Sequence, residues 1–297
     1  MAEFRSGFIT LLGKPNVGKS TLLNTIIGQK VSITSDKPQT TRHRILGIRT
    51  QESHQFIFVD TPGLHEPSGK TINRIITGTT RSSLSGVNII VLMITRHGWD
   101  AKDLFVLKSV RDISIPVVLV INKIDTIRNK QRLLPLIEES SKRMKFAEIF
   151  PISAKSGANT KELVSVLGAM LPVSPMCFPE DQITDRTPGF MISELIREQV
   201  FRLLGQELPY EAAVRIAGIE DEDPLRIEAH IWVARESQKG IVVGKNGRRI
   251  KEIGTRSRRS IEQYLGKHVY LDLFVKVRKG WADNQADPNN LGYIEDR

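Results

Sequence analysis

Phosphate binding is the chemistry best suited to the segment Gly13-Lys14-Pro15-Asn16-Val17-Gly18-Lys19-Ser20-Thr21. Its first eight residues have the pattern G-x-x-x-x-G-K-[ST], in which glycines let successive backbone N–H groups point at one anion. The lysine of this pattern, Lys19, reaches the β- and γ-phosphates of a nucleotide, and the hydroxyl of Ser20 binds Mg²⁺. The segment therefore predicts a nucleoside triphosphate site.

A second candidate element lies 40 residues after Ser20, in the tetrapeptide Asp60-Thr61-Pro62-Gly63. A carboxylate at the end of a strand beside a phosphate loop can hold Mg²⁺, usually through a water molecule. The backbone N–H of Gly63 can meet the γ-phosphate. Alone, the tetrapeptide is a plain turn sequence, and its position after an apolar strand is what indicates a metal and phosphate contact.

Two further segments have the residue types that select a base, namely Asn122-Lys123-Ile124-Asp125 and Ser153-Ala154-Lys155. The ionised carboxylate of Asp125 only accepts, so it can take two N–H bonds, from N1 and N2 of guanine. Adenine has no such donor pair and would leave the carboxylate unpaired. We expect the Ala154 N–H to donate to guanine O6 and the stem of Lys123 to cover the base.

The elements that must position these residues alternate between strand and helix. Short apolar runs predict strands over residues 8–12, 45–50, 55–59, 87–94, 116–121 and 148–152. Amphipathic stretches predict helices over residues 20–27, 71–84, 101–112, 129–145 and 159–171. This alternation predicts an α/β domain with a mostly parallel sheet and helices on both faces, and with the site at the carboxyl ends of the strands.

The composition of the 297 residues is that of a soluble chain of about two domains, with 40% hydrophobic and 26% charged residues. No apolar run approaches the roughly 18 residues of a membrane span. The N-terminus lacks the core of a signal peptide, and Cys177 is the only cysteine. These observations predict a cytoplasmic protein without an internal disulfide.

Four prolines, at positions 172, 175, 179 and 188, mark the end of the first domain. Such a stretch suits a semi-rigid linker. The predicted organisation is a nucleotide-binding domain over residues 1–174, a linker over 175–189, a second domain over 190–280 and a tail over 281–297.

The second domain is predicted to have the order αββααβ, with helices over residues 193–204, 238–243 and 248–265 and strands over 212–219, 226–234 and 268–277. Between the last two helices lies a Gly-x-x-Gly turn, and basic residues surround it. From Arg235 to Lys279 the net charge is +9, nearly the whole excess of the chain's +10. The predicted contacts to a polyanion are Gly244, Lys245, Asn246, Gly247, Arg248, Arg249 and Lys251, with Arg256, Arg258 and Arg259 extending the basic patch.

The order of motifs in the first domain resembles the Ras-like GTPases of the translation-factor class. The resemblance implies a switch segment at Gln39, Thr40, Thr41, Arg42 and His43. It implies that Thr41, with Thr40 as the alternative, joins Mg²⁺ when GTP is bound, and that Lys19, Thr41 and Gly63 act in catalysis.

The residue after Gly63 is Leu64, where Ras has a glutamine that orients the attacking water. We therefore expect slow hydrolysis by the isolated protein. Several bacterial GTPases with Asn at the position of Asn16 use potassium, and this resemblance implies a K⁺ ion near Asn16 and the switch backbone.

The second domain resembles a type II KH domain, and a GTPase domain followed by one KH domain is the architecture of the bacterial Era GTPases. The resemblance implies binding of the 3′ region of 16S ribosomal RNA, assistance to maturation of the small ribosomal subunit, peripheral contact with the inner membrane and a monomeric state. In the KH fold the Gly-x-x-Gly turn lets the RNA backbone approach closely.

Other functions remain open at this point. An ATP-using phosphotransferase would differ from a GTPase in nucleotide competition. An RNA chaperone, with the first domain only a nucleotide-sensing structural module, would assemble ribosomes normally after substitution of Lys19. A membrane-trafficking GTPase lacks support, because the sequence has no lipidation signal.

Overall fold

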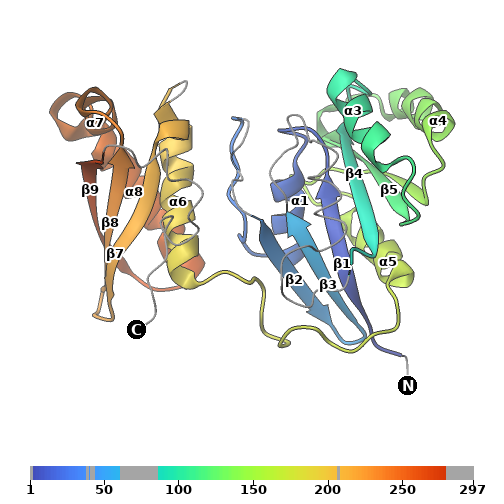
Figure 1. The fold of residues 1–297 in the computed structure, drawn as a ribbon, viewed down its shortest axis with the longest axis horizontal. Coiled ribbons are helices and arrows are strands. Elements are labelled where there is room, and N and C mark those ends of the chain that lie inside the picture. The colour runs from blue at the N-terminus through green and yellow to red at the C-terminus, as the bar shows by residue number, and fades with distance from the viewer. Residues whose placement is uncertain (1–2, 38–39, 41–43, 61–85, 206–207, 279–297) are drawn as a thin grey trace. The chain divides into compact units, whose positions relative to one another are not determined.

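The computed structural model describes residues 3–37, 40, 44–60, 86–205 and 208–278. The chain divides into two compact units, Met1–Asp185 and Arg186–Arg297. Figure 1 shows the elements of each unit. Among the described residues, no helix has the length and apolar character that crossing a bilayer requires.

The first unit is built on a six-stranded sheet with the order β2-β3-β1-β4-β5-β6. All neighbouring strands run parallel except β2, which pairs antiparallel with β3. The strands are β1 (Arg5–Leu12), β2 (Ile45–Gln51), β3 (His54–Asp60), β4 (Ile89–Thr95), β5 (Val117–Asn122) and β6 (Glu148–Pro151). The predicted mostly parallel sheet is therefore confirmed.

The α-helices of this unit within the described residues are α1 (Lys19–Ile27), α3 (Ala101–Val110), α4 (Leu133–Arg143) and α5 (Thr160–Met170). Leucine and isoleucine side chains of α1 and α5 pack on one face of the sheet, with Val91 and Met93. Those of α3 and α4 pack on the other face, with Ile90 and Leu92. Strand β4 is thus buried on both faces, as its continuous apolar run predicts.

Two predicted helices need comment. The helix expected over residues 129–145 begins only at Leu133, because Asn129 accepts from the Gln131 N–H (3.0 Å) and caps a separate 3₁₀ turn, Lys130–Arg132. A side chain that satisfies the backbone locally competes with the α-helical bonds. The helix expected over residues 71–84 lies outside the described residues.

The segment predicted as a linker is bonded to the first unit at several points. Gln55 accepts from the Cys177 N–H (2.8 Å) and the Phe178 N–H (3.0 Å) and donates to the Phe178 carbonyl (2.8 Å). The Ile48 N–H donates to the Ile183 carbonyl at 2.8 Å, and Gly47 bridges to Thr184. Residues 177 and 178 are therefore held by β3, and residues 183–185 cover the outer edge of β2 at residues 46–48.

The described residues of the second unit form three strands and three α-helices in the predicted order αββααβ. They are α6 (Pro188–Leu203), β7 (Ala213–Glu220), β8 (Leu225–Val233), α7 (Glu236–Val243), α8 (Arg248–Leu265) and β9 (Val269–Val277). The sheet order is β7-β8-β9, with β7 antiparallel and β9 parallel to β8. The helices contribute to one apolar core with the inward residues of the strands.

Helix α6 begins five residues before the predicted start at residue 193. Thr187 caps it by accepting from the Phe190 N–H at 3.2 Å, and Pro188 occupies its first turn. Proline suits that position because its missing N–H would have no helical partner there. The sequence interpretation, in which Pro188 belongs to a linker, was wrong for this residue.

Candidate functional site

The phosphate loop joins β1 to α1 and depends on two glycines in the left-handed region. Gly13 has φ 149° and Gly18 has φ 104°. A Cβ on Gly13 would lie 2.5 Å from the Met93 carbonyl, and one on Gly18 would lie 2.3 Å from Nδ2 of Asn122. Both distances exclude a side chain. The loop therefore needs glycine for its close approach to β4 and β5 as well as for its turn.

Lys19 begins α1 and folds back over this loop. Its Nζ donates to the Gly13 carbonyl (2.8 Å) and to the Lys14 carbonyl (3.0 Å). Burial lowers the pKa of Lys19 from 10.5 to about 8, against the raising effect of the Asp60 charge. A buried ammonium with only neutral carbonyl partners is suited to meet the negative charge of a phosphate.

We expect nucleotide binding to take up a proton at alkaline pH through Lys19. A bound phosphate raises the pKa of Lys19 again, so affinity for GDP should fall as pH rises above about 8, by up to about tenfold per unit. Calorimetry at about pH 8.5 in two buffers of different ionisation enthalpy measures the uptake. Absence of uptake there, or equal uptake at neutral pH, would contradict this assignment.

Asp60 ends β3 and is fully buried beside the phosphate loop. Its Oδ2 accepts from the hydroxyls of Ser20 and Ser32, each at 2.8 Å. Its Oδ1 is buried and has no hydrogen-bond partner among the described residues. Burial raises the pKa of this carboxyl, against the two hydroxyl bonds and the Lys19 charge. A buried carboxylate oxygen without a partner, next to a serine hydroxyl, fits a hard divalent cation such as Mg²⁺.

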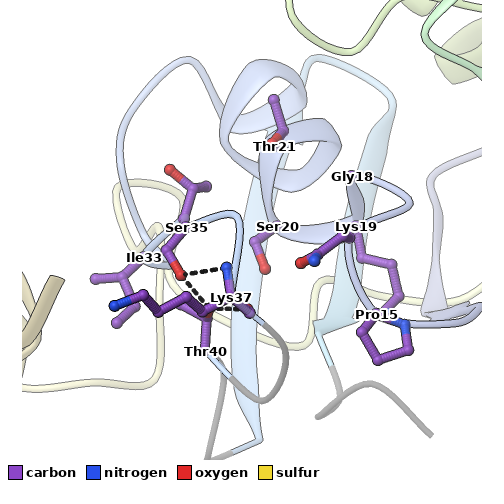
Figure 2. A pocket seen from close by; sticks show the side chains of 11 residues that line it. Pro15, Gly18, Lys19, Ser20, Thr21, Ile33, Ser35, Lys37 and Thr40 are labelled. Atoms are coloured by element: carbon purple, nitrogen blue, oxygen red, sulfur yellow. Dashed lines mark hydrogen bonds between the residues drawn. The ribbon is translucent and has the colours of Figure 1, made fainter. Parts of the chain in front are cut away.

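A pocket lies over α1 and the loop that follows it (Figure 2). In the figure Lys19 and Ser20 face the same space as the side chain of Thr40. Thr40 is held by the Ser35 hydroxyl (2.6 Å) and by the Lys37 carbonyl (2.7 Å). The residues that line the pocket are Pro15, Asn16, Gly18, Lys19, Ser20, Thr21, Ile33, Thr34, Ser35, Lys37 and Thr40.

Several predicted site residues lie outside the described part of the chain. These are Gln39, Thr41, Arg42, His43, Thr61, Pro62, Gly63 and Leu64. The choice between Thr40 and Thr41 as the magnesium ligand therefore stays open. Asn16, which has φ 63°, donates from Nδ2 to the Asp36 carbonyl at 2.6 Å and so connects the phosphate loop with the segment before Thr40.

Asn122 connects the phosphate loop with the predicted base-binding segments. Its Nδ2 donates to the Val17 carbonyl at 2.7 Å. Its Oδ1 accepts from the N–H groups of Lys123 (2.7 Å) and Ala154 (2.9 Å). The Ala154 N–H thus has a partner inside the protein, which differs from its predicted role toward guanine O6. The phosphate and base segments form one hydrogen-bonded unit.

Asp125 and Ser153 meet at the end of the same sheet. The Ser153 hydroxyl donates to Oδ1 of Asp125 at 2.7 Å. The side chain of Asp125 is exposed, so its carboxylate can still face a ligand. The structure therefore brings Asp125 and Ser153 into contact and makes Ser153 the residue that orients the carboxylate. Lys155 is exposed beside them.

Sequence reasoning missed two residues of this site. Ser32 is buried and bonds to Asp60, while Thr25 donates to the Ala154 carbonyl at 2.6 Å. Ser32 lies in an irregular segment without a periodic pattern, so no local signal could have found it. Thr25 lies on the polar side of an amphipathic helix, which indicates only exposure.

The Gly-x-x-Gly turn of the second unit separates α7 from α8. Gly244, Asn246 and Gly247 all have positive φ, at 71°, 52° and 72°. A Cβ on Gly244 would lie 2.7 Å from Cβ of Arg249, so this glycine allows a tight turn. The charged and amide side chains predicted to meet a polyanion are exposed around it, namely Lys245, Asn246, Arg248, Arg249 and Lys251.

The predicted extension of the basic patch along α8 is weaker than its sequence suggests. Arg256 pairs with Glu252 (2.6 Å) and Arg258 pairs with Glu262 (2.9 Å). Among the described residues, Lys245, Arg248, Lys251 and Arg259 have no carboxylate partner. The uncompensated charge is therefore concentrated near the turn, with Arg259 farther along the helix.

Comparison with known proteins is consistent with both units. A model of the 50S ribosome-binding GTPase family matches residues 8–123, and a model of the KH domain family matches residues 207–282. GTPase Era of Coxiella burnetii is 50% identical over 97% of this chain and 98% of its own length. GTPase Era of Stenotrophomonas maltophilia is 47% identical over 97% of each chain.

Two solved structures extend this similarity to the three-dimensional fold. One is Era in complex with MgGDPNP and nucleotides 1506–1542 of 16S ribosomal RNA, with a TM-score of 0.84. The other is a single-residue variant of Aquifex aeolicus Era bound to GDP·AlF4⁻, with a TM-score of 0.85. Each is 41% identical and covers 95% of this chain and 97% of its own.

Proposed function

Because this chain belongs to the Era family of GTPases, it binds and hydrolyses GTP and carries an RNA-binding KH domain, and we propose that its RNA is the 3′ region of 16S ribosomal RNA. The observation that supports the RNA proposal most directly is the exposed, uncompensated charge of Lys245, Arg248 and Lys251 beside the Gly-x-x-Gly turn. By this proposal the chain assists maturation of the small ribosomal subunit.

In the nucleotide site each residue has a role that follows from its contacts. Lys19 holds the β- and γ-phosphates, and Asp125 accepts from the guanine base. Asn122 connects the phosphate loop to the base-binding segment by hydrogen bonds. Ser20 and Asp60 would hold Mg²⁺, together with Thr41 or Thr40. When bound, Mg²⁺ neutralises charge that develops on the phosphates. The products are GDP and phosphate.

We expect the proposed RNA contacts to depend on salt through Lys245 and Lys251. Replacing both with Gln should lower affinity for a strand of 16S nucleotides 1506–1542 and reduce the slope of log K against log salt by about 0.7 per charge. Fluorescence anisotropy over a salt series measures both. The control is Arg256→Gln, because Arg256 is already paired with Glu252. An unchanged slope in the double variant would count against the proposal.

We further propose that K⁺ assists hydrolysis, since the chain has leucine at position 64 in place of a water-orienting glutamine. Asn16 lines the pocket and bonds to the Asp36 carbonyl, so its side chain connects the phosphate loop with the segment before Thr40. A cation there would supply positive charge to the transition state, as an arginine finger does.

The test compares GTP turnover in matched KCl and NaCl buffers. We expect turnover to be about tenfold faster or more in KCl, as for a moderate charge-stabilising group. We expect Asn16→Ala to lose this difference while it retains GDP binding. Equal rates of the unmodified protein in the two salts would exclude a role for K⁺.

We also propose a cytoplasmic location, peripheral contact with the inner membrane and a monomeric state. The alternative function, an RNA chaperone in which the first domain is only a structural module, would leave small-subunit assembly unchanged in a Lys19→Ala variant.

A further inference from the structure

The described helices of the second unit pack on one face of its sheet and leave the other face uncovered. Leu225, Ile227, Ala229, Ile231 and Val233 of β8 alternate toward the apolar core, so the even-numbered residues of β8 point the other way. The same alternation holds in β9, where Val269, Leu271, Leu273, Val275 and Val277 point inward. We call the outer side the open face, and its residues are Ala213, Arg215, Gly218, Glu220, Arg226, Glu228, His230, Trp232, Tyr270, Asp272, Phe274, Lys276 and Arg278.

Aromatic rings and cations alternate across the open face. Register pairs Arg226 with Tyr270 and His230 with Phe274 on neighbouring strands. Tyr270 is 53% exposed and Phe274 is 49% exposed, which is high for large rings within a strand. The Arg226 guanidinium lies 5.7 Å from the Tyr270 ring, and His230 meets Phe274 edge to face at 6.1 Å.

Two guanidinium groups lie against the ring of Trp232, one from strand β7 and one from the residue that follows strand β9. The guanidinium of Arg278 lies 4.4 Å from its ring centre and that of Arg215 lies 5.5 Å from it. These stacks hold two flat guanidinium groups in defined positions. Guanidinium planes and exposed rings are the surfaces on which unpaired RNA bases stack.

The end of the open face around Trp232 favours an anionic partner, because the three carboxylates of the face lie toward its other end. Asp272 pairs with Arg226 at 3.2 Å, Glu228 bonds to His230 at 2.8 Å, and Glu220 lies opposite Arg226 in the strand register. Among the described residues, Arg215, Lys276 and Arg278 have no carboxylate partner. Phosphate groups would therefore meet uncompensated cations beside the stacking surfaces.

We propose that the open face is a second binding surface for single-stranded RNA, with Tyr270 and Phe274 as stacking platforms and Arg215, Lys276 and Arg278 as phosphate contacts. The inference rests on the proposed function. One KH cleft holds about four nucleotides, so most nucleotides of an RNA the length of 16S nucleotides 1506–1542 would lie outside that cleft.

The experiment uses the full chain and two RNA probes, the 1506–1542 strand and an oligonucleotide of about six nucleotides from its 3′ part. Tyr270→Leu with Phe274→Leu keeps apolar bulk and removes the rings. We expect affinity for the long strand to fall about tenfold per ring, with little change for the short probe. Tyr270→Trp should retain affinity. Phe105→Ala is the control, because Phe105 is 43% exposed in the first unit.

The outcomes separate this inference from the proposed function. If the unmodified chain binds neither probe, the proposed function fails. The double Gln variant, Lys245→Gln with Lys251→Gln, should bind both probes more weakly. If it does so while the double Leu variant binds the long strand normally, only the open-face inference fails. Sedimentation velocity of the double Leu variant is run in parallel, and a change in mass would overturn the inference in favour of a protein contact between copies.

Discussion

Replacing Asp125 with Asn is expected to lower affinity for GTP by about 10⁴-fold and to raise affinity for xanthosine triphosphate. A carboxylate accepts from both guanine N1–H and N2–H, whereas an amide has one donor and one acceptor. The amide matches xanthine, which has an oxygen where guanine has its amino group. The Ser153 hydroxyl would still bond to the amide oxygen, so the side chain should keep its position.

Competition binding with GTP, ATP and xanthosine triphosphate measures this exchange of specificity. Asp112→Asn is a suitable control, because Asp112 is an exposed carboxylate of the same unit outside the site. Retention of GTP preference by the Asp125→Asn variant would mean that another group selects the base.

Replacing Gly18 with Ala should weaken binding of both the phosphates and the base. The new Cβ would lie 2.3 Å from Nδ2 of Asn122, and Asn122 holds the Val17 carbonyl and the N–H groups of Lys123 and Ala154. Loss of these bonds should cost about 10²- to 10³-fold in GDP affinity. Equilibrium titration with a fluorescent GDP analogue measures the loss.

Gly28 provides a matched control for Gly18. It caps the other end of the same helix with φ 81°, but a Cβ there would meet nothing within 4 Å. Gly28→Ala should therefore cost about 1 kcal/mol of stability from backbone strain and leave nucleotide affinity unchanged. If both variants lost nucleotide affinity to a similar degree, the contact with Asn122 would not explain the effect.

The sequence predicted those parts of the site that are formed by short segments at strand ends. The phosphate loop, Asp60, Asn122, Asp125 and Ser153 follow apolar strands, and parallel strands place their carboxyl ends along one edge. The αββααβ order was likewise predictable, because each element has its own hydrophobic period.

What could not be predicted depends on contacts between distant residues. Nothing local indicates that Ser32 bonds to Asp60, or that Gln55 holds the backbone of residues 177 and 178. Proline is ambiguous locally, since Pro188 begins a helix and the other prolines of the segment do not. The ion pairs Arg256–Glu252 and Arg258–Glu262, in contrast, could have been predicted, because each joins residues four positions apart on one helix.

The covering of β2 by residues 183–185 has a consequence for dividing the chain. Strand β2 is the last in its sheet, and Leu46 and Ile48 donate their N–H groups to Asp185 Oδ1 (2.9 Å) and the Ile183 carbonyl (2.8 Å). A fragment that stopped at residue 174 would leave these donors bare on an outermost strand, which is a template for self-association. A fragment that continued through Asp185 would keep residues 183–185 bonded to the edge of β2 and so would protect that edge.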